Sequence, residues 1–137
     1  AYEEELQVVK NTTSADRVEL KPAITAEEII AFQQLIRKIP MADNVLEYAV
    51  NLAAKTRPNT ERAEDYVNNF LSWGAGPRAS QFLVLGAKCH AAFRGKYSPD
   101  IEDVKAVALP ILRHRIVKNY KAEAEGISVD DIILKLL

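Results

Sequence analysis

The stretch that decides the fold is WGAGPRAS, residues 73–80, which leads into a long apolar run at residues 82–93. Proline is tolerated in the first turn of a helix, where its missing N–H would have no partner anyway. We therefore predict a helix from Pro77 to about Arg94. This segment is apolar almost all round, so we expect a central helix with neighbours on several sides. Gly86, which costs about 1 kcal/mol relative to alanine in a helix interior, predicts close approach by another helix.

Arg78 lies in the first turn of this predicted helix. A helix N-terminus carries free N–H groups and a partial positive charge, and both favour an anion. The guanidinium adds a planar fork of donors that suits phosphate or carboxylate. On spacing alone, the simpler interpretation is favoured, which is a glycine-rich turn followed by a solvated arginine. The anion-binding interpretation stays open.

Composition places the chain among soluble single domains. It has 137 residues, of which 48% are hydrophobic and 27% are charged, enough for one domain with a substantial core. Lys and Arg number 18 and Asp and Glu number 19, so the balance of charge offers no electrostatic case for nucleic acid or an anionic membrane. The single cysteine excludes an internal disulfide, and two histidines are too few for a convincing metal cluster.

Targeting signals are not evident in this sequence. No uncharged run approaches the length of a membrane span, and the acidic start does not resemble a secretory signal. We therefore expect a cytoplasmic protein with no membrane partner. The first residue is not methionine, which suggests a piece of a longer protein.

Helix signals recur along the whole chain. Thr25 and Glu28 make a capping box, and Ser128 caps the last helix with Asp131 as its partner. The sequence predicts helices at about 2–11, 25–38, 43–56, 62–71 and 77–94. A further helix is expected with Ser98 as its N-cap and Pro99 as its first residue, up to a break or kink at Pro110, and a last helix is expected after Ser128. The fold class is therefore all-α, a compact bundle of about five to seven helices with at most short extended segments. The helix at 62–71 is expected to deliver Trp73 into the core.

Catalytic motifs are absent from the sequence. The only Gly-Lys pair, Gly95-Lys96, is followed by Tyr97, so no phosphate-cradling loop is present. There is no Gly-x-Ser-x-Gly elbow and no His-Glu-x-x-His. His90 lies in an apolar helix and is interpreted as a satisfied core residue, and Cys89 as a small buried hydrophobic residue. We do not expect this chain alone to be a catalyst.

A basic cluster, Arg113-His114-Arg115, has two interpretations. It could contact phosphates of a nucleotide or a nucleic acid. It could also pair with acidic residues, for example those at 61–65, and this structural interpretation is favoured.

Several further motifs follow WGAGPRAS at a characteristic spacing. They are Ala87-Lys88, Arg94-Gly95, PDIEDV at 99–104, LRHRI at 112–116, EAEGI at 123–127 and VDDI at 129–132. In order and in separation they resemble the C-terminal lid of MoxR-type AAA+ ATPases. The resemblance covers most of the chain and is weakest over residues 10–24.

The resemblance implies that residues 1–137 are a single helical lid domain, the C-terminal part of a longer ATPase. Residues 1–24 would be a helix and connector that join it to an N-terminal AAA+ core. Arg78 would be the second sensor, which reaches the γ-phosphate of ATP and supports its hydrolysis, with Gly76 and Pro77 beside the nucleotide. ATP with Mg²⁺ would be the cofactor of the full-length protein, and no cofactor would bind tightly to this chain alone.

The resemblance also implies partners. Family members are chaperone-like ATPases, often homo-oligomeric rings, that help to mature or insert metal cofactors and often act with proteins containing a von Willebrand factor A domain. The lid would couple nucleotide state to movement of the lid and the ring. Two alternatives remain: a stand-alone helical protein-interaction module, and a helix-turn-helix DNA binder that uses Arg113 and Arg115. The net charge of −1 argues against the second.

Overall fold

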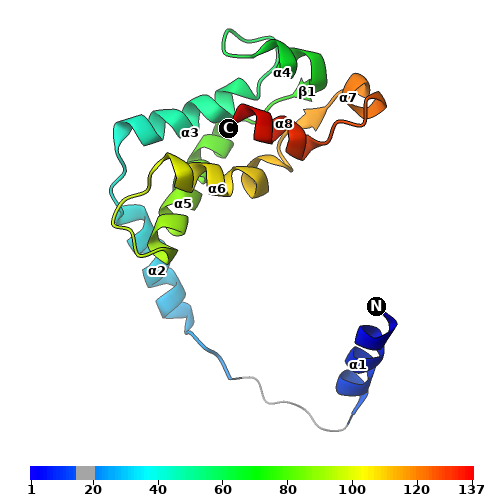
Figure 1. Cartoon of the computed structure of the whole chain (residues 1–137). Coiled ribbons are helices and arrows are strands. Elements are labelled where there is room, and N and C mark those ends of the chain that lie inside the picture. The colour runs from blue at the N-terminus through cyan, green and yellow to red at the C-terminus, as the bar shows by residue number, and fades with distance from the viewer. Residues whose placement is uncertain (15–20) are drawn as a thin grey trace. The chain divides into compact units, whose positions relative to one another are not determined.

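The predicted all-α class is confirmed. The computed structural model describes residues 1–14 and 21–137, and these contain eight helices and one two-stranded sheet (Figure 1). The chain divides into two units, residues 1–30 and 31–137. Residues 15–20 of the predicted connector lie outside the described residues.

The first unit contains α1 (Tyr2–Thr13) and the start of α2 (Ala26–Lys38). The capping box predicted for α2 is confirmed, because Thr25 N donates to Glu28 Oε2 at 2.7 Å and Glu28 N donates to Thr25 Oγ1 at 3.2 Å. The acidic side chains in the first turns of α1 and α2 complement the helix dipoles.

The second unit holds the elements that position the candidate site. They follow the end of α2 in the order α3 (Asp43–Lys55), α4 (Asp65–Phe70), β1 (Leu71–Trp73), α5 (Pro77–Phe93), α6 (Ile101–Leu112), β2 (Val117–Lys118), α7 (Tyr120–Ala124) and α8 (Val129–Leu136). As expected, α5 is central, since it lies against both α6 and α3 (Figure 1). Helix α4 is shorter than the predicted segment 62–71. The short α7 was not predicted, and the Asn119 side chain begins it by accepting a hydrogen bond from Ala122 N at 3.0 Å.

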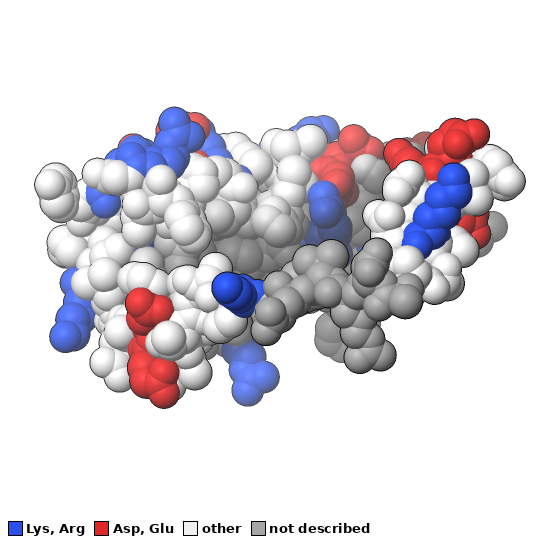
Figure 2. All heavy atoms as spheres, turned by 90° about the horizontal axis from the view of Figure 1, so that it is seen from below, with Lys and Arg blue, Asp and Glu red and all other residues white. Residues whose placement is uncertain are grey.

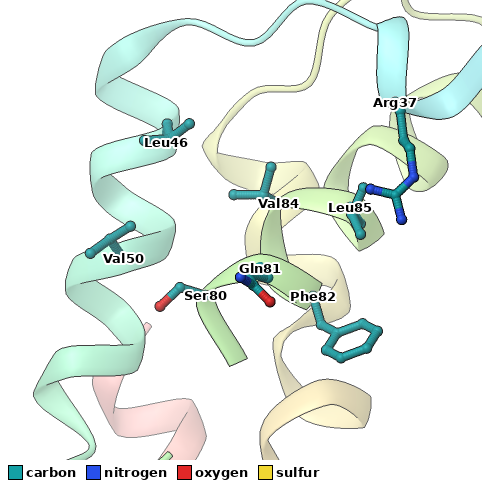
Figure 3. Close-up of a pocket in the computed structure, with 8 residues that line it drawn as sticks. All are labelled: Arg37, Leu46, Val50, Ser80, Gln81, Phe82, Val84 and Leu85. Carbon is teal, nitrogen blue, oxygen red and sulfur yellow. The ribbon is translucent and has the colours of Figure 1, made fainter. Parts of the chain in front are cut away.

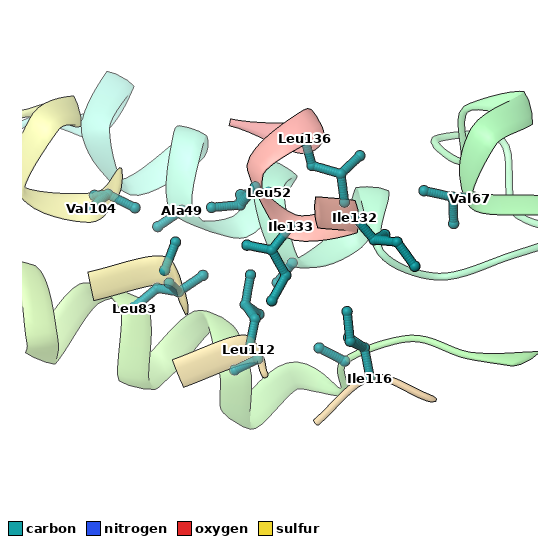
Figure 4. Packing of buried hydrophobic residues seen from close by; sticks show 14 of the residues in the cluster. Ala49, Leu52, Val67, Leu83, Val104, Leu112, Ile116, Ile132, Ile133 and Leu136 are labelled. Carbon is teal, nitrogen blue, oxygen red and sulfur yellow. The ribbon is translucent and has the colours of Figure 1, made fainter. Parts of the chain in front are cut away.

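The core forms where α3, α5, α6 and α8 meet (Figure 4). Leu83, Leu112 and Ile132 are fully buried there, and burial of one such side chain contributes about 1.5–3 kcal/mol. The close approach predicted at Gly86 is confirmed. A Cβ at that position would lie 2.9 Å from Ile111 Cδ1 and 3.2 Å from the Cγ2 atom of Val107, both on α6.

The prediction that Trp73 enters the core is wrong, since its side chain is 71% exposed. Trp73 ends β1 and pairs across the antiparallel sheet with Val117 of β2, which is 54% exposed. Directly paired residues lie on the same face of a sheet, and here that face is open to solvent. Neighbouring elements likewise do not bury every apolar side chain of α5, because Phe82 is 46% and Phe93 is 92% exposed.

The start of α6 also differs from the prediction. The helix is capped by Asp100 rather than Ser98. Asp103 N donates to Asp100 Oδ1 at 3.1 Å and Asp100 N donates to Asp103 Oδ2 at 2.9 Å, so a reciprocal capping box outcompetes the single hydroxyl. Ser98 Oγ instead donates to Pro40 O at 3.1 Å.

A break at Pro110 does not occur. Helix α6 continues through it to Leu112, and Pro110 itself is exposed while Leu112 is fully buried. Continuation of the helix past Pro110 keeps Leu112 buried in the core, and this burial favours an unbroken last turn. None of the helices in residues 1–14 and 21–137 has the length and hydropathy to cross a bilayer.

Candidate functional site

The loop that precedes α5 is held against the C-terminal end of α3. Ala75 N donates to Thr56 Oγ1 at 2.9 Å, and Arg57 Nε donates to Ala75 O at 2.8 Å. The Thr56 hydroxyl is fully buried and donates in turn to Ala53 O at 2.7 Å. The N–H and C=O of Ala75 are therefore both engaged by the end of one helix, which sets the direction in which α5 begins.

Gly74 allows this contact. A Cβ at Gly74 would lie 2.5 Å from the Cα of Arg57 and 2.6 Å from the carbonyl carbon of Thr56. These are backbone atoms, so a side chain cannot be accommodated by a change of rotamer. The glycine is needed because the loop crosses directly over the last residues of α3.

The first turn of α5 presents the residues that the sequence singled out. Gly76 is the N-cap, Pro77 follows it, and Arg78 is the second residue of the helix. All three are exposed. Within the described part of the chain, the Arg78 guanidinium makes no hydrogen bond or ion pair, the backbone N–H groups of Gly76 and Arg78 have no partner, and the first turn of α5 holds no acidic residue. The arrangement suits an anion on physical grounds.

His90 and Cys89 do not contribute to this end of the helix. His90 Nδ1 lies 2.7 Å from Asp103 Oδ1, which agrees with the interpretation of His90 as a satisfied residue, although its side chain stays 30% exposed. Cys89 is a free, half-buried thiol.

Asp103 is the centre of a polar cluster between α5 and α6. Its side chain is 1% exposed, and Lys96 Nζ lies 2.9 Å from Oδ2. Burial alone would raise the pKa of Asp103, but hydrogen bonds from the Asp100 N–H, His90 and Lys96 together outweigh it and hold that pKa well below its usual 3.8. Bonds to Asp100 and Asp103 raise the pKa of Lys96. The cluster therefore connects the end of α5, the following loop and the start of α6.

This lowered pKa predicts an acid-sensitive contribution to stability. The ionised Asp103 carboxylate stabilises the fold fully above the unfolded value of 3.8. The contribution is lost as pH falls from there toward the lower folded value. Asp103→Asn should therefore reduce the difference in unfolding free energy between about pH 5 and pH 3, measured by urea denaturation at each pH. The exposed Glu102→Gln variant should keep more of that difference, and equal pH slopes in the two variants would contradict this assignment.

Arg113 is engaged within the fold. Its Nε and Nη2 donate to Asp130 Oδ1 and Oδ2 at 2.9 and 2.6 Å, which connects the end of α6 to the start of α8 and lowers the pKa of Asp130. The favoured structural interpretation is thus supported for Arg113. The suggested partners at 61–65 are wrong for this residue.

Arg115 is also occupied. Its Nη1 donates to Ile111 O at 2.9 Å, its guanidinium lies 4.9 Å from the Phe82 ring centroid, and it contacts the His114 ring. Figure 2 shows separate Lys and Arg groups among uncharged residues on the face in view, rather than one broad basic field. These contacts leave little reason to assign Arg113 and Arg115 to DNA.

Sequence reasoning missed the residues that hold the loop. The sequence places Thr56 and Arg57 at the end of a predicted helix and Gly74 in the glycine-rich turn before α5, and nothing in it pairs these two segments. The one feature that could have drawn attention to these residues is their position, since all three lie just beyond the end of a helix or a strand. Their contact crosses 18 or 19 residues of chain, and no local pattern encodes it.

The family model for the AAA lid domain matches residues 63–136, more than half of the chain. This chain belongs to the AAA lid domain family. The matched segment runs from just before α4 to the end of α8, so it includes the loop at Gly74, the whole of α5 and Arg78.

Individual relatives point to the same subfamily of lids. Chaperone MoxR1 of Mycobacterium tuberculosis is 30% identical over 118 residues, which are 82% of this lid chain and 31% of that protein. Uncharacterized protein YeaC of Bacillus subtilis is 25% identical over 138 residues, 100% of this chain and 40% of that protein. The crystal structure of a proposed ATPase from Cytophaga hutchinsonii superposes with a TM-score of 0.83 at 30% identity, and the match covers 99% of this chain and 42% of that one.

These matches confirm the resemblance to the C-terminal lid of MoxR-type AAA+ ATPases. The lid chain spans less than half of the length of each of these three proteins.

Proposed function

We propose that this lid supplies Arg78 to the phosphates of ATP held by an AAA+ core in the same protein. The single observation that carries the proposal is the unpaired, exposed Arg78 guanidinium in the first turn of α5, which directly follows a loop that α3 holds in place. A backbone that is fixed before the nucleotide arrives leaves only the Arg78 side chain to be ordered when it binds phosphate. Arg78 would stabilise the negative charge that develops on the transferred phosphoryl group.

Gly76 and Pro77 would lie beside the nucleotide. Nothing lies within 4 Å of the position that a Cβ of Gly76 would occupy, so the N-cap leaves room for a phosphate to approach the backbone N–H of Gly76. Proline at the next position removes an N–H without loss of an internal bond. ATP with Mg²⁺ would supply the reactive phosphoryl group, and this lid would contribute the Arg78 guanidinium that stabilises its charge.

The remaining features of the proposal concern the longer protein. An arginine that contacts the γ-phosphate in one nucleotide state but not another would couple hydrolysis to the angle of the lid, since a ligand shifts an equilibrium only through differential contacts. We propose that residues 1–24 join the lid to the AAA+ core, and that the protein is a cytoplasmic, chaperone-like ATPase. Its partners would be other copies in a homo-oligomeric ring and a protein with a von Willebrand factor A domain. The relative named Chaperone MoxR1 supports this class of activity.

In the longer protein, Arg78→Ala should lower ATP turnover about 100-fold, the effect of removing one charge-stabilising donor from a transition state. ATP binding should change much less, because the core would hold most of the nucleotide. Steady-state turnover and calorimetric ATP titration measure the two quantities. Arg78→Lys should restore only part of the turnover, because an ammonium lacks the planar fork.

The matched control is Arg94→Ala. Arg94 is an exposed arginine just beyond the opposite end of α5, and its loss should leave turnover unchanged. Unchanged turnover in Arg78→Ala would reduce Arg78 to a solvated helix-start residue. The lid chain alone should bind ATP weakly or not at all, and tight binding by calorimetry would contradict the proposed division of the site.

The stand-alone interaction module is the alternative. The sequence that precedes Ala1 in the encoding gene discriminates between the two, because an AAA+ core requires a phosphate-binding loop upstream. Absence of such a loop would favour the interaction module.

A further inference from the structure

A second surface feature, whose lining does not include Arg78, is a groove of about 560 Å³ between α3, α5 and the end of α2. Its walls are largely apolar, with Leu46 and Val50 on α3 facing Val84 on α5, while Phe82 and Leu85 lie further along (Figure 3). All of its lining residues belong to the unit formed by residues 31–137.

The lining side chains retain much of their exposed surface. Leu46 is 43%, Val50 44% and Phe82 46% exposed. Apolar residues that cluster at a hollow, rather than scatter singly, mark a surface that another molecule can cover. The volume lies within the range of about 300–1,000 Å³ that is usual for binding pockets.

The charge at the groove is of one sign, positive. Arg37 is the one charged lining residue and lies beside Leu85 in Figure 3. Its guanidinium makes no hydrogen bond, ion pair or ring contact with the residues that the structure describes. Lys88, one turn beyond Leu85 on α5, donates only to the main-chain oxygen of Arg37 at 3.3 Å, so its positive charge is also unneutralised. No acidic side chain lines the groove.

We propose that this groove binds an amphipathic helix of a partner protein whose apolar face ends in an acidic side chain. The lining on α5 runs from Ser80 to Leu85, six residues separated by five steps of 1.5 Å, or about 7.5 Å in all. This is the length over which a bound helix presents apolar residues at i and i+3 or i+4. An aspartate or glutamate at the end of that face would meet the Arg37 fork, which binds carboxylates bidentately. The inference goes beyond the proposed nucleotide site, because it requires neither ATP nor Arg78.

The test is a selection from a phage-displayed library of 18-residue helices, with apolar residues on one face and the other positions randomised. The selection uses the 137-residue chain as bait without nucleotide. We expect enriched clones to carry Asp or Glu at one end of the apolar face. Their affinity, measured by biolayer interferometry, should fall by about tenfold or more with Arg37→Glu and with Val50→Asp. A Glu→Lys change in the peptide should restore binding to the Arg37→Glu variant.

Matched controls lie on the same elements and elsewhere on the surface. Lys38→Glu reverses a charge beside Arg37 without touching the groove lining, and Leu134→Asp alters an apolar side chain that is 56% exposed on α8. Both should bind the peptides as the unchanged chain does. Circular dichroism establishes that every variant is folded, which is expected because the substituted side chains are already partly in solvent.

Three results would overturn the proposal. The first is a library that yields no binder, and the second is clones without an acidic preference or insensitive to Val50→Asp. The third is self-association of the chain in sedimentation that Val50→Asp abolishes, because the groove would then bind a second copy. Arg78→Ala should leave peptide binding unchanged, so failure here and failure of the nucleotide proposal are distinguishable.

Discussion

Gly74→Ala should destabilise the 137-residue chain by about 3 kcal/mol, at the upper end of the cost of overpacking. The new Cβ would be forced to within 2.5 Å of Arg57 Cα and 2.6 Å of the Thr56 carbonyl carbon. Relief requires the loop to move away from α3, which breaks both hydrogen bonds of Ala75. Urea denaturation followed by circular dichroism measures the loss as a lower midpoint.

Gly76→Ala is the matched control two residues away. Nothing lies within 4 Å of the corresponding Cβ position, and replacing glycine at an N-cap should cost no more than about 1 kcal/mol. Similar losses in the two variants would show that the contact over α3 does not hold the loop. The comparison therefore separates steric exclusion from a general need for glycine in this turn.

Asp103→Ala should destabilise the chain by about 3 kcal/mol, because it removes charge-assisted hydrogen bonds from a buried carboxylate. The side chain is 1% exposed. Its loss would leave His90 and Lys96 without their shared partner and the Asp100 N–H without an acceptor. The expected result is a lower urea midpoint at neutral pH.

Asp103→Asn and Glu102→Ala complete this comparison. Asparagine keeps the shape and part of the hydrogen bonding but not the charge, so its loss should be intermediate. Glu102 lies in the same helical turn and pairs only with Lys105 at the surface, where an exposed pair contributes little. A loss in Glu102→Ala as large as that in Asp103→Ala would remove the special role of the buried carboxylate.

Most helices could be predicted from local signals. The capping boxes at Thr25 and Ser128 place the starts of α2 and α8 as observed, and Pro77 after glycine places the start of α5. These predictions succeed because a cap or an N1 proline acts within one helical turn. The expected N-cap at Ser98 is wrong because two local signals competed. The Asp100 and Asp103 carboxylates together satisfy two N–H groups, whereas the serine hydroxyl could satisfy one.

Predictions that depended on distant partners were less secure. The predicted helix at 62–71 would deliver Trp73 into the core, yet the pairing of Trp73 with Val117 puts it on an open face. The Arg113 partner was sought at 61–65 and lies at Asp130. In both cases the sequence indicates the kind of contact that the side chain can make, but it does not indicate which element lies opposite that side chain.

The sequence by itself determined the all-α class, the order of the main helices and the resemblance to an AAA+ lid, and it singled out Arg78 as the candidate site residue. Only the tertiary structure decided how Arg78 is presented. The end of α3 holds Ala75 through Thr56 and Arg57, Gly74 admits the crossing, and no described residue neutralises the guanidinium. The physical reason is range, since caps and periodicity act between neighbours in the chain, whereas steric contact and burial depend on residues that folding brings together.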